Sequence, residues 1–112
     1  MIYTDSIKSN LDFQKVYKNG KSYANKLLVM YVVENSTENN RLGISVSKKV
    51  GNSVVRHHLK RLIKESYRLH EAVFNSGLDI VIVARVNAKN AEYKDIESAV
   101  LHLGKLHKIT QN

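Results

Sequence analysis

Two apolar runs constrain the fold of this chain more than any other feature of its sequence. KLLVMYVVE (26–34) is rich in β-branched and aromatic residues and has the pattern of a strand buried on both faces. LDIVIVAR (78–85) is another strong strand candidate, and RLGISVS (41–47) alternates apolar with small or polar residues, as a half-buried strand does. A sheet built from such strands needs helices to cover it.

Three further segments supply the helices that this sheet requires. Asn10 is expected to cap a short helix over 11–19, and Gly20 is expected to end it. A long amphipathic helix is expected over about 53–73, and a third helix over 92–108. Each of these helices follows or precedes a predicted strand, so the helices can pack directly on the sheet.

The connections complete the predicted topology. ENSTENN (34–40) is a polar turn that we expect to join two strands as a hairpin, and a short extra strand near 21–25 also fits the pattern. The length of 112 residues is that of one domain, 1–112. The prediction is the α/β (α+β) class: a single two-layer sandwich of a small mixed sheet and helices, in the order helix, two strands, helix, strand, helix.

The positive charge of the chain is concentrated in KKVGNSVVRHHLKRLIKESYR (48–68). The whole chain has 18 Lys and Arg against 10 Asp and Glu, which gives +8, and this segment has seven against one, which gives +6. Like charges one turn apart destabilise a helix, so an external partner is expected to offset the repulsion. Nucleic acid is the leading candidate for that partner, and an anionic membrane surface is the second.

On a helix, this segment separates into two faces. At about 100° per residue, Leu59, Leu62 and Ile63 fall within one apolar stripe, which is expected to pack on the sheet. The opposite side forms a basic ridge about three turns long, and its residues are Arg56, His57, Lys60, Arg61, Lys64 and Arg68.

The loop before this helix has the features of a phosphate site. Gly51 permits backbone geometries that other residues resist, and Asn52 or Ser53 can cap the helix. The free N–H groups and the positive dipole end of the helix would then lie beside Lys48 and Lys49. An ordinary capped and solvated helix is the alternative, and it is disfavoured because the cationic loop, the helix start and the ridge adjoin.

Three aromatic residues have two possible roles. Phe13 and Tyr17 are four residues apart and therefore share one face of the first helix, and Tyr31 lies in the first strand. Core packing is the commoner role for such residues. Stacking on unpaired bases is the other, because every base presents a π-face.

The sequence offers little for catalysis. There is no cysteine, so a disulfide framework and a thiolate metal site are both excluded. The acidic residues are scattered, and neither His57 with His58 nor His102 with His107 has a spacing that suits one metal, so we expect no protein metal site. No nucleophile elbow or nucleotide-binding loop is present, so no small-molecule substrate is expected. Without a signal peptide or a membrane-length run, we expect a soluble cytoplasmic protein.

The segment RLGISVSKKVGNSVVRHHLKRLIKE (41–65) resembles the signature of the bacterial ribonuclease P protein family, which runs K-x-x-G-N-A-V-x-R-N-R-x-K-R-x-x-R. The similarity extends to DFQKVYKNGKSYAN (12–25), to DIVIVAR (79–85) and to the final helix, and so covers nearly the whole chain. There are departures: His57 and His58 stand where the family has Asn and Arg, and Lys64 replaces a common Arg.

The resemblance implies a sandwich with a left-handed βαβ crossover, an exception to the usual handedness. It also implies a role in the ribonuclease P holoenzyme, an endoribonuclease in which a catalytic RNA subunit does the chemistry with Mg²⁺ and binds most of that Mg²⁺. The protein carries no catalytic residue in this scheme. The partners are the ribonuclease P RNA and precursor tRNA, whose 5′ leader is removed to give the mature end.

The residues implied to bind the two RNAs form two sets. The RNA-binding signature comprises Lys48, Lys49, Gly51, Asn52, Arg56, His57, His58, Lys60, Arg61, Lys64 and Arg68. The cleft for the single-stranded leader, between the sheet and the first helix, is lined by Phe13, Tyr17 and Tyr31. Two other functions stay open: a stand-alone RNA-binding protein, such as a ribosomal component, and a protein-only nuclease, which the lack of paired acids disfavours.

Overall fold

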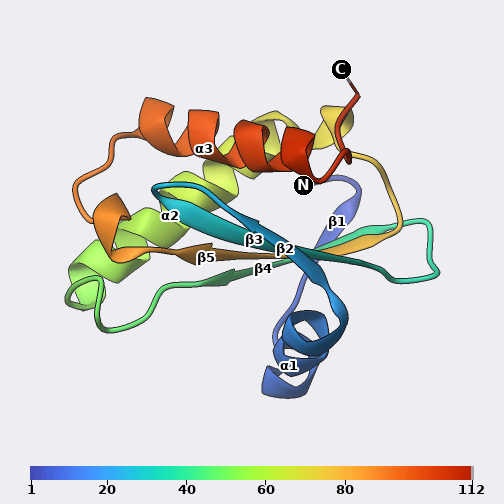
Figure 1. Cartoon of the computed structure of the whole chain (residues 1–112), viewed down its shortest axis with the longest axis horizontal. Helices are drawn as coiled ribbons and strands as arrows, with labels where there is room; N and C mark the ends of the chain where they lie inside the picture. The colour runs from blue at the N-terminus through green and yellow to red at the C-terminus, as the bar shows by residue number, and fades with distance from the viewer. Residues whose placement is uncertain (112) are drawn as a thin grey trace.

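The computed structural model describes residues 1–111 as a mixed sheet of five strands with three α-helices, which confirms the predicted α/β class (Figure 1). The strands are β1 (Thr4–Ser6), β2 (Lys21–Ala24), β3 (Leu28–Glu34), β4 (Asn40–Ser45) and β5 (Leu78–Ala84). The helices are α1 (Asn10–Asn19), α2 (Ser53–Leu69) and α3 (Tyr93–Leu106), with short 3₁₀ turns η1 (Glu71–Val73) and η2 (Val86–Ala88).

Strand β5 occupies the centre of the sheet, whose order is β1-β4-β5-β3-β2. It pairs antiparallel with β3 and parallel with β4. The predicted hairpin at 34–40 is therefore wrong, because β5 lies between the two strands that this loop joins. The loop instead passes the start of β5, where the Asn35 N–H donates to the carbonyl oxygen of Gly77 at 2.9 Å.

The two edges of the sheet are short strands. The extra strand expected near 21–25 is β2, which pairs antiparallel with β3. The other edge, β1, was not predicted, because TDS is polar and too short to show an apolar period. It forms by pairing parallel with β4, where Thr4 lies opposite Asn40. Only a neighbouring strand already in place gives such a segment its extended structure.

The β4–α2–β5 unit is a crossover between two adjacent parallel strands. In Figure 1 both strands run from right to left, α2 lies above the sheet, and β4 lies on the β1 side of β5, away from the viewer. This arrangement makes the connection left-handed, against the common rule, as the family resemblance implies.

The sheet is covered on both faces, and β5 contributes to both cores. Ile80 and Ile82 are fully buried in the core beneath α2 and α3. Val81 points to the opposite face and packs with Val16 of α1 and with Ile7. The sheet and the α2–α3 layer are the two predicted layers, and α1 covers part of the second face (Figure 1). Each buried aliphatic side chain contributes about 1.5–3 kcal/mol of hydrophobic free energy.

The ends of the helices differ from the prediction in three places. Ser9 caps α1 in place of Asn10, because its hydroxyl oxygen accepts the N–H of Asp12 at 3.1 Å. Gly20 does end α1, but its backbone is extended, and glycine fits because a Cβ there would lie 2.6 Å from the carbonyl oxygen of Val16. Helix α2 ends at Leu69, and the last predicted turn is the separate 3₁₀ turn η1.

His107 closes the C-terminal end of α3 onto the sheet. Its Nε2 donates to the carbonyl oxygen of Met30 at 2.8 Å, and its ring packs edge-on against Tyr23 with 4.7 Å between centroids. Burial lowers the pKa of His107, and the charge of Lys21 adds to this, while the hydrogen bond to Met30 opposes it. The folded protein therefore holds this imidazole neutral more strongly than the unfolded chain does.

The expected consequence is a loss of stability below the ordinary histidine pKa of 6.5. The unfolded chain takes up the proton more readily there, so the free energy of unfolding falls as the pH falls through that value. Urea unfolding at about pH 7.5 and about pH 5.5 measures the change. His107→Gln keeps an N–H donor and does not titrate, so its stability should fall less between these two pH values. An equal fall in both proteins would contradict the assignment.

Candidate nucleic-acid interface

Helix α2 separates its apolar and basic residues as its period predicts. Leu59, Ile63 and Tyr67 are fully buried against the sheet and α3. Ser66 is buried among them without a polar cost, because its hydroxyl donates to the carbonyl oxygen of Ile63 at 2.9 Å. The residues predicted as a ridge lie outside this buried stripe and are exposed, apart from the half-buried Arg56, and we call them the basic face: Arg56, His57, Lys60, Arg61, Lys64 and Arg68.

The start of α2 has the predicted cap. The side-chain oxygen of Asn52 accepts the N–H of Val55 at 3.0 Å. Lys48 and Lys49 are exposed in the loop before it, which is anchored by the buried side chains of Val46 and Val50. The cationic loop, the positive end of the helix dipole and the basic face are thus continuous on one side of the molecule.

The cationic groups of the basic face are not equally available. Arg68 forms an ion pair with Glu65 one turn earlier, which lowers the pKa of Glu65 and raises that of Arg68. By contrast, Lys60, Arg61 and Lys64 form no ion pair within residues 1–111. Arg56 forms no ion pair there either but is half-buried, so Lys60, Arg61 and Lys64 are the exposed Lys and Arg side chains of the basic face without an ion pair in the described part of the chain. His57 and His58 flank them and line one hollow of about 560 Å³ together with Arg61.

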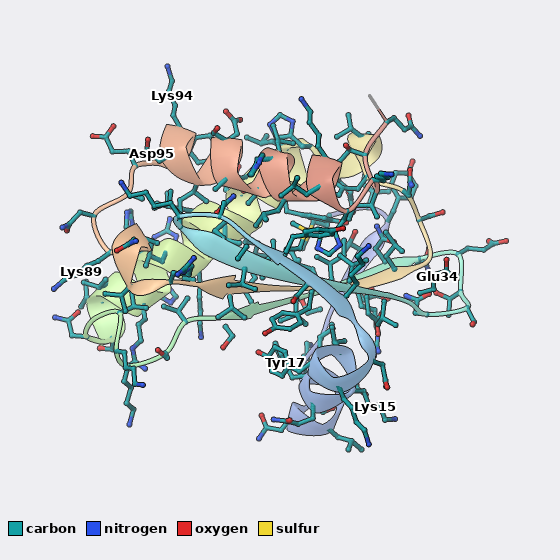
Figure 2. All side chains as sticks on the ribbon, in the orientation of Figure 1. Lys15, Tyr17, Glu34, Lys89, Lys94 and Asp95 are labelled. Carbon is teal, nitrogen blue, oxygen red and sulfur yellow. The ribbon has the colours of Figure 1, made fainter. Side chains whose placement is uncertain are left out.

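The three aromatic residues come together as a cluster. The rings of Phe13 and Tyr17 lie 6.3 Å apart, and Tyr17 meets Tyr31 edge-on at 5.0 Å. All three rings are partly exposed and pack over a small core that includes Val81. Figure 2 shows Tyr17 between α1 and the sheet, on the face opposite to α2. The basic face and the aromatic cluster are therefore two separate surfaces, with the sheet between them.

Gly43 of β4 gives the aromatic cluster its place. A Cβ at this position would lie 2.7 Å from Cε1 of Phe13, so any side chain would push the ring away from the sheet. Gly43 and Tyr31 both pair with Val81, so they lie at the same level of the sheet on the two sides of β5. The sequence prediction did not include Gly43, although a glycine within an alternating strand is a signal of close approach.

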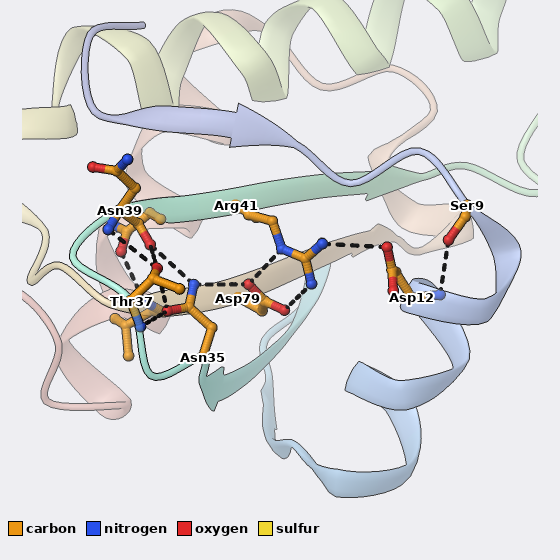
Figure 3. A network of polar contacts seen from close by, with 9 residues as sticks. Ser9, Asp12, Asn35, Thr37, Asn39, Arg41 and Asp79 are labelled. Atoms are coloured by element: carbon orange, nitrogen blue, oxygen red, sulfur yellow. Dashed lines mark hydrogen bonds and ion pairs between the residues drawn. The ribbon is translucent and has the colours of Figure 1, made fainter.

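A polar network fixes α1 against the sheet beside this cluster (Figure 3). The guanidinium of Arg41 donates from Nε to Asp79 at 3.0 Å and from Nη1 to Asp12 of α1 at 3.2 Å. Asn35 also donates to Asp79, at 2.9 Å. Burial alone would raise the pKa of Asp79, but the hydrogen bonds from Arg41 and Asn35 and the charge of Arg41 hold it below its usual value.

This network was invisible in the sequence. Its partners are 29, 38 and 44 residues apart, so no local period connects them. Its effect on the site is indirect: Arg41 joins the ends of β4, β5 and α1, and the first turn of α1 carries Phe13. Removal of either charge would leave the other group partly buried without its partner, which is the costly way to lose an ion pair.

Metal binding by the protein alone has no support among residues 1–111. No group of three or more His, Asp or Glu side chains there lies close enough to hold a metal ion. The expectation of Mg²⁺ held mainly by an RNA partner stays a prediction. None of the helices in the described part of the chain has the length and apolarity needed to cross a membrane.

Comparison with known proteins identifies the family. Residues 1–108 match the family model described as Ribonuclease P. The chain belongs to the ribonuclease P protein family. A relative from Lachnoclostridium phytofermentans, named ribonuclease P protein component, is 64% identical over 106 residues, which is 95% of this chain and 91% of the relative. A relative of the same name from Clostridioides difficile is 50% identical over 103 residues, 91% of this chain and 90% of the relative.

Solved structures agree with the fold. The RNase P protein of Staphylococcus aureus is 40% identical, with a TM-score of 0.87 over 95% of this chain and 97% of that one. The RNase P protein from Thermotoga maritima is 28% identical, with a TM-score of 0.83 over 90% and 96% of the two chains. The resemblance inferred from the signature is thus confirmed. Ribonuclease P membership gives the chain a role in tRNA processing, within an enzyme that also contains RNA.

Proposed function

We propose that the chain is the protein subunit of a ribonuclease P and binds the catalytic RNA through the basic face of α2 and the loop before it. The observation that carries the proposal is the cluster of three exposed cations, Lys60, Arg61 and Lys64, which have no ion pair among residues 1–111 and lie on the helix that Asn52 caps. Neutralising phosphates releases counterions, and this is the main source of affinity in such complexes.

The aromatic cluster is the proposed site for the single-stranded 5′ leader of precursor tRNA. Phe13, Tyr17 and Tyr31 present partly exposed rings on one surface, as stacking on unpaired bases requires. Their place on the sheet face opposite to α2 supports a division of labour, in which the catalytic RNA and the leader contact different sides of the protein.

The chemistry in this proposal belongs to the RNA subunit, with Mg²⁺ stabilising the phosphate that is cleaved. The protein residues bind and orient: the basic face holds the catalytic RNA, and the aromatic cluster holds the leader in register with it.

Reconstitution tests this function directly. We expect the purified protein alone to leave precursor tRNA intact, and to restore removal of the leader by a cognate catalytic RNA at low Mg²⁺. Cleavage is followed across Mg²⁺ concentrations with and without the protein. A lack of stimulation would exclude the proposal. Equal binding of ribosomal RNA, without preference for a tRNA that carries a leader, would favour a stand-alone RNA-binding protein, and cleavage without added RNA would favour a protein-only nuclease.

Removing one charge of the basic face should change the salt dependence of binding. Lys60→Gln or Arg61→Gln should weaken binding of the catalytic RNA and reduce the slope of log K against log salt by about one unit per lost phosphate contact. Lys94→Gln is the matched control, because Lys94 is exposed and points away from the sheet on α3 (Figure 2). A slope unchanged by both basic-face variants, or lowered equally by Lys94→Gln, would exclude these contacts.

A substitution at Phe13 should separate leader binding from packing. Phe13→Leu keeps an apolar side chain over Gly43 but removes the ring, so it should cost about 1–3 kcal/mol of binding for a substrate with a leader. Binding of a tRNA without a leader should not change. Both affinities are measured for the reconstituted complex. An equal loss of affinity for the two substrates would show that Phe13 has only a structural role.

A further inference from the structure

A groove of about 300 Å³ separates α2 from the N-terminal segment at the β1–β4 edge of the sheet, and Phe13, Tyr17 and Tyr31 do not line it. Its floor is apolar and includes Leu42 and Ile44 of β4, which are buried and half-buried. Its rim is cationic and consists of Lys60, Arg61 and Lys64, with His57 beside them. An apolar floor under a cationic rim is a different chemistry from that of a plain phosphate-binding surface.

The second wall of the groove is the segment that contains β1, and the protein holds this segment firmly. The carboxylate of Glu71 accepts the N–H of Ile2 at 2.9 Å on one oxygen and the N–H of Tyr3 at 3.0 Å on the other. A buried hydrogen bond of 2.9 Å joins the hydroxyls of Thr4 and Tyr67. The groove is therefore a built feature, shaped by contacts to η1 and α2.

Glu71 stays ionised near neutral pH, which keeps this wall in place. Burial by itself would raise the pKa of Glu71, but hydrogen bonds from Thr4, Ile2 and Tyr3 outweigh it and hold the pKa below its usual value. Asn40 adds a further tie, because its side-chain amide donates to the Tyr67 hydroxyl at 3.2 Å and its oxygen accepts the N–H of Leu78 at 2.9 Å.

The occupant must offer both an apolar surface and negative charge. A free phosphate would use only the rim, and an apolar side chain would use only the floor. A nucleotide has both parts, since the face of its base is apolar and its phosphate is anionic. The volume lies at the lower limit of small-ligand sites, so it has room for one base and not for a stacked series.

We propose that this groove receives one unpaired nucleotide of the catalytic RNA, with its base on Leu42 and Ile44 and its phosphate at the cationic rim. Proteins recognise RNA most specifically through such splayed-out bases. The inference rests on the proposed function, and it adds a base-insertion site to the phosphate contacts of α2. The leader is not the proposed occupant, because none of Phe13, Tyr17 and Tyr31, which form its proposed site, lines the groove.

Filling the groove without altering its charges tests the proposal. Ser6 lines the groove and is exposed, so Ser6→Trp places a large ring in it and leaves the rim intact. We expect affinity for the catalytic RNA to fall about tenfold, in line with the loss of one stacked base, while the salt slope stays unchanged. The preference for substrates with a leader over those without should also be unchanged.

The matched control is Ser98→Trp, which fills a separate cavity of about 460 Å³ beside α3 and should leave affinity as it is. Circular dichroism and thermal unfolding of both variants check that the fold is retained. Full affinity in Ser6→Trp, or an equal loss of affinity in Ser98→Trp, would exclude the groove as a binding site for a base of the catalytic RNA. Failure of the unmodified protein to bind the catalytic RNA at all would overturn the proposed function itself.

A second measurement identifies the chemistry without relying on a variant. Methyl NMR of Leu42 and Ile44 is recorded while AMP, and separately inorganic phosphate, is added at millimolar concentration. AMP should shift these methyl signals saturably, because its base covers the floor, whereas phosphate should leave them in place. An absence of methyl shifts with AMP, or the same shifts with phosphate, would overturn base insertion.

Discussion

The central position of β5 is the constraint on which the rest of this structure depends. Its side chains are buried on both faces, so helices must cover the sheet on each side. Helices α2 and α3 satisfy one face and α1 part of the other (Figure 1). This distribution gives the protein two distinct surfaces, the basic face and the aromatic cluster, and the sheet holds them at a fixed relation.

Two sets of polar contacts fix the positions of those surfaces, because apolar packing alone is not directional. Arg41 and Asp79 tie α1 to the sheet beside the aromatic cluster, and Glu71 ties the N-terminal segment along α2. Hydrogen bonds are directional, and a buried donor or acceptor without a partner destabilises the fold. Each set of contacts therefore favours one arrangement of the elements that it joins. Lys60, Arg61 and Lys64 have no ion pair among residues 1–111, which suits the proposed RNA partner.

The features that could be predicted are those encoded within a few turns of chain. The two faces of α2 follow from its period of 3.6 residues, and the cap at Asn52 follows from a local hydrogen bond. The hairpin at 34–40 was predicted wrongly, since nothing local shows that β5 inserts between β3 and β4. The cap of α1 is Ser9 and not the predicted Asn10. Both side chains can cap a helix, and the extended backbone at Ser9 decides between them. Strand β1 was missed because it exists only through its pairing with β4.

The sequence by itself determined the fold class, the family, the basic face of α2 and the identity of the aromatic trio, because each rests on local periodicity or on a contiguous motif. Only the tertiary structure decided the strand order, the separation of the two surfaces by the sheet, and the groove beneath the N-terminal segment. These depend on contacts such as Glu71 with Ile2 and Arg41 with Asp79, which join residues 69 and 38 positions apart. Contacts between residues so far apart in the sequence cannot be read from a local pattern, since the same residues are chemically able to pair with many others.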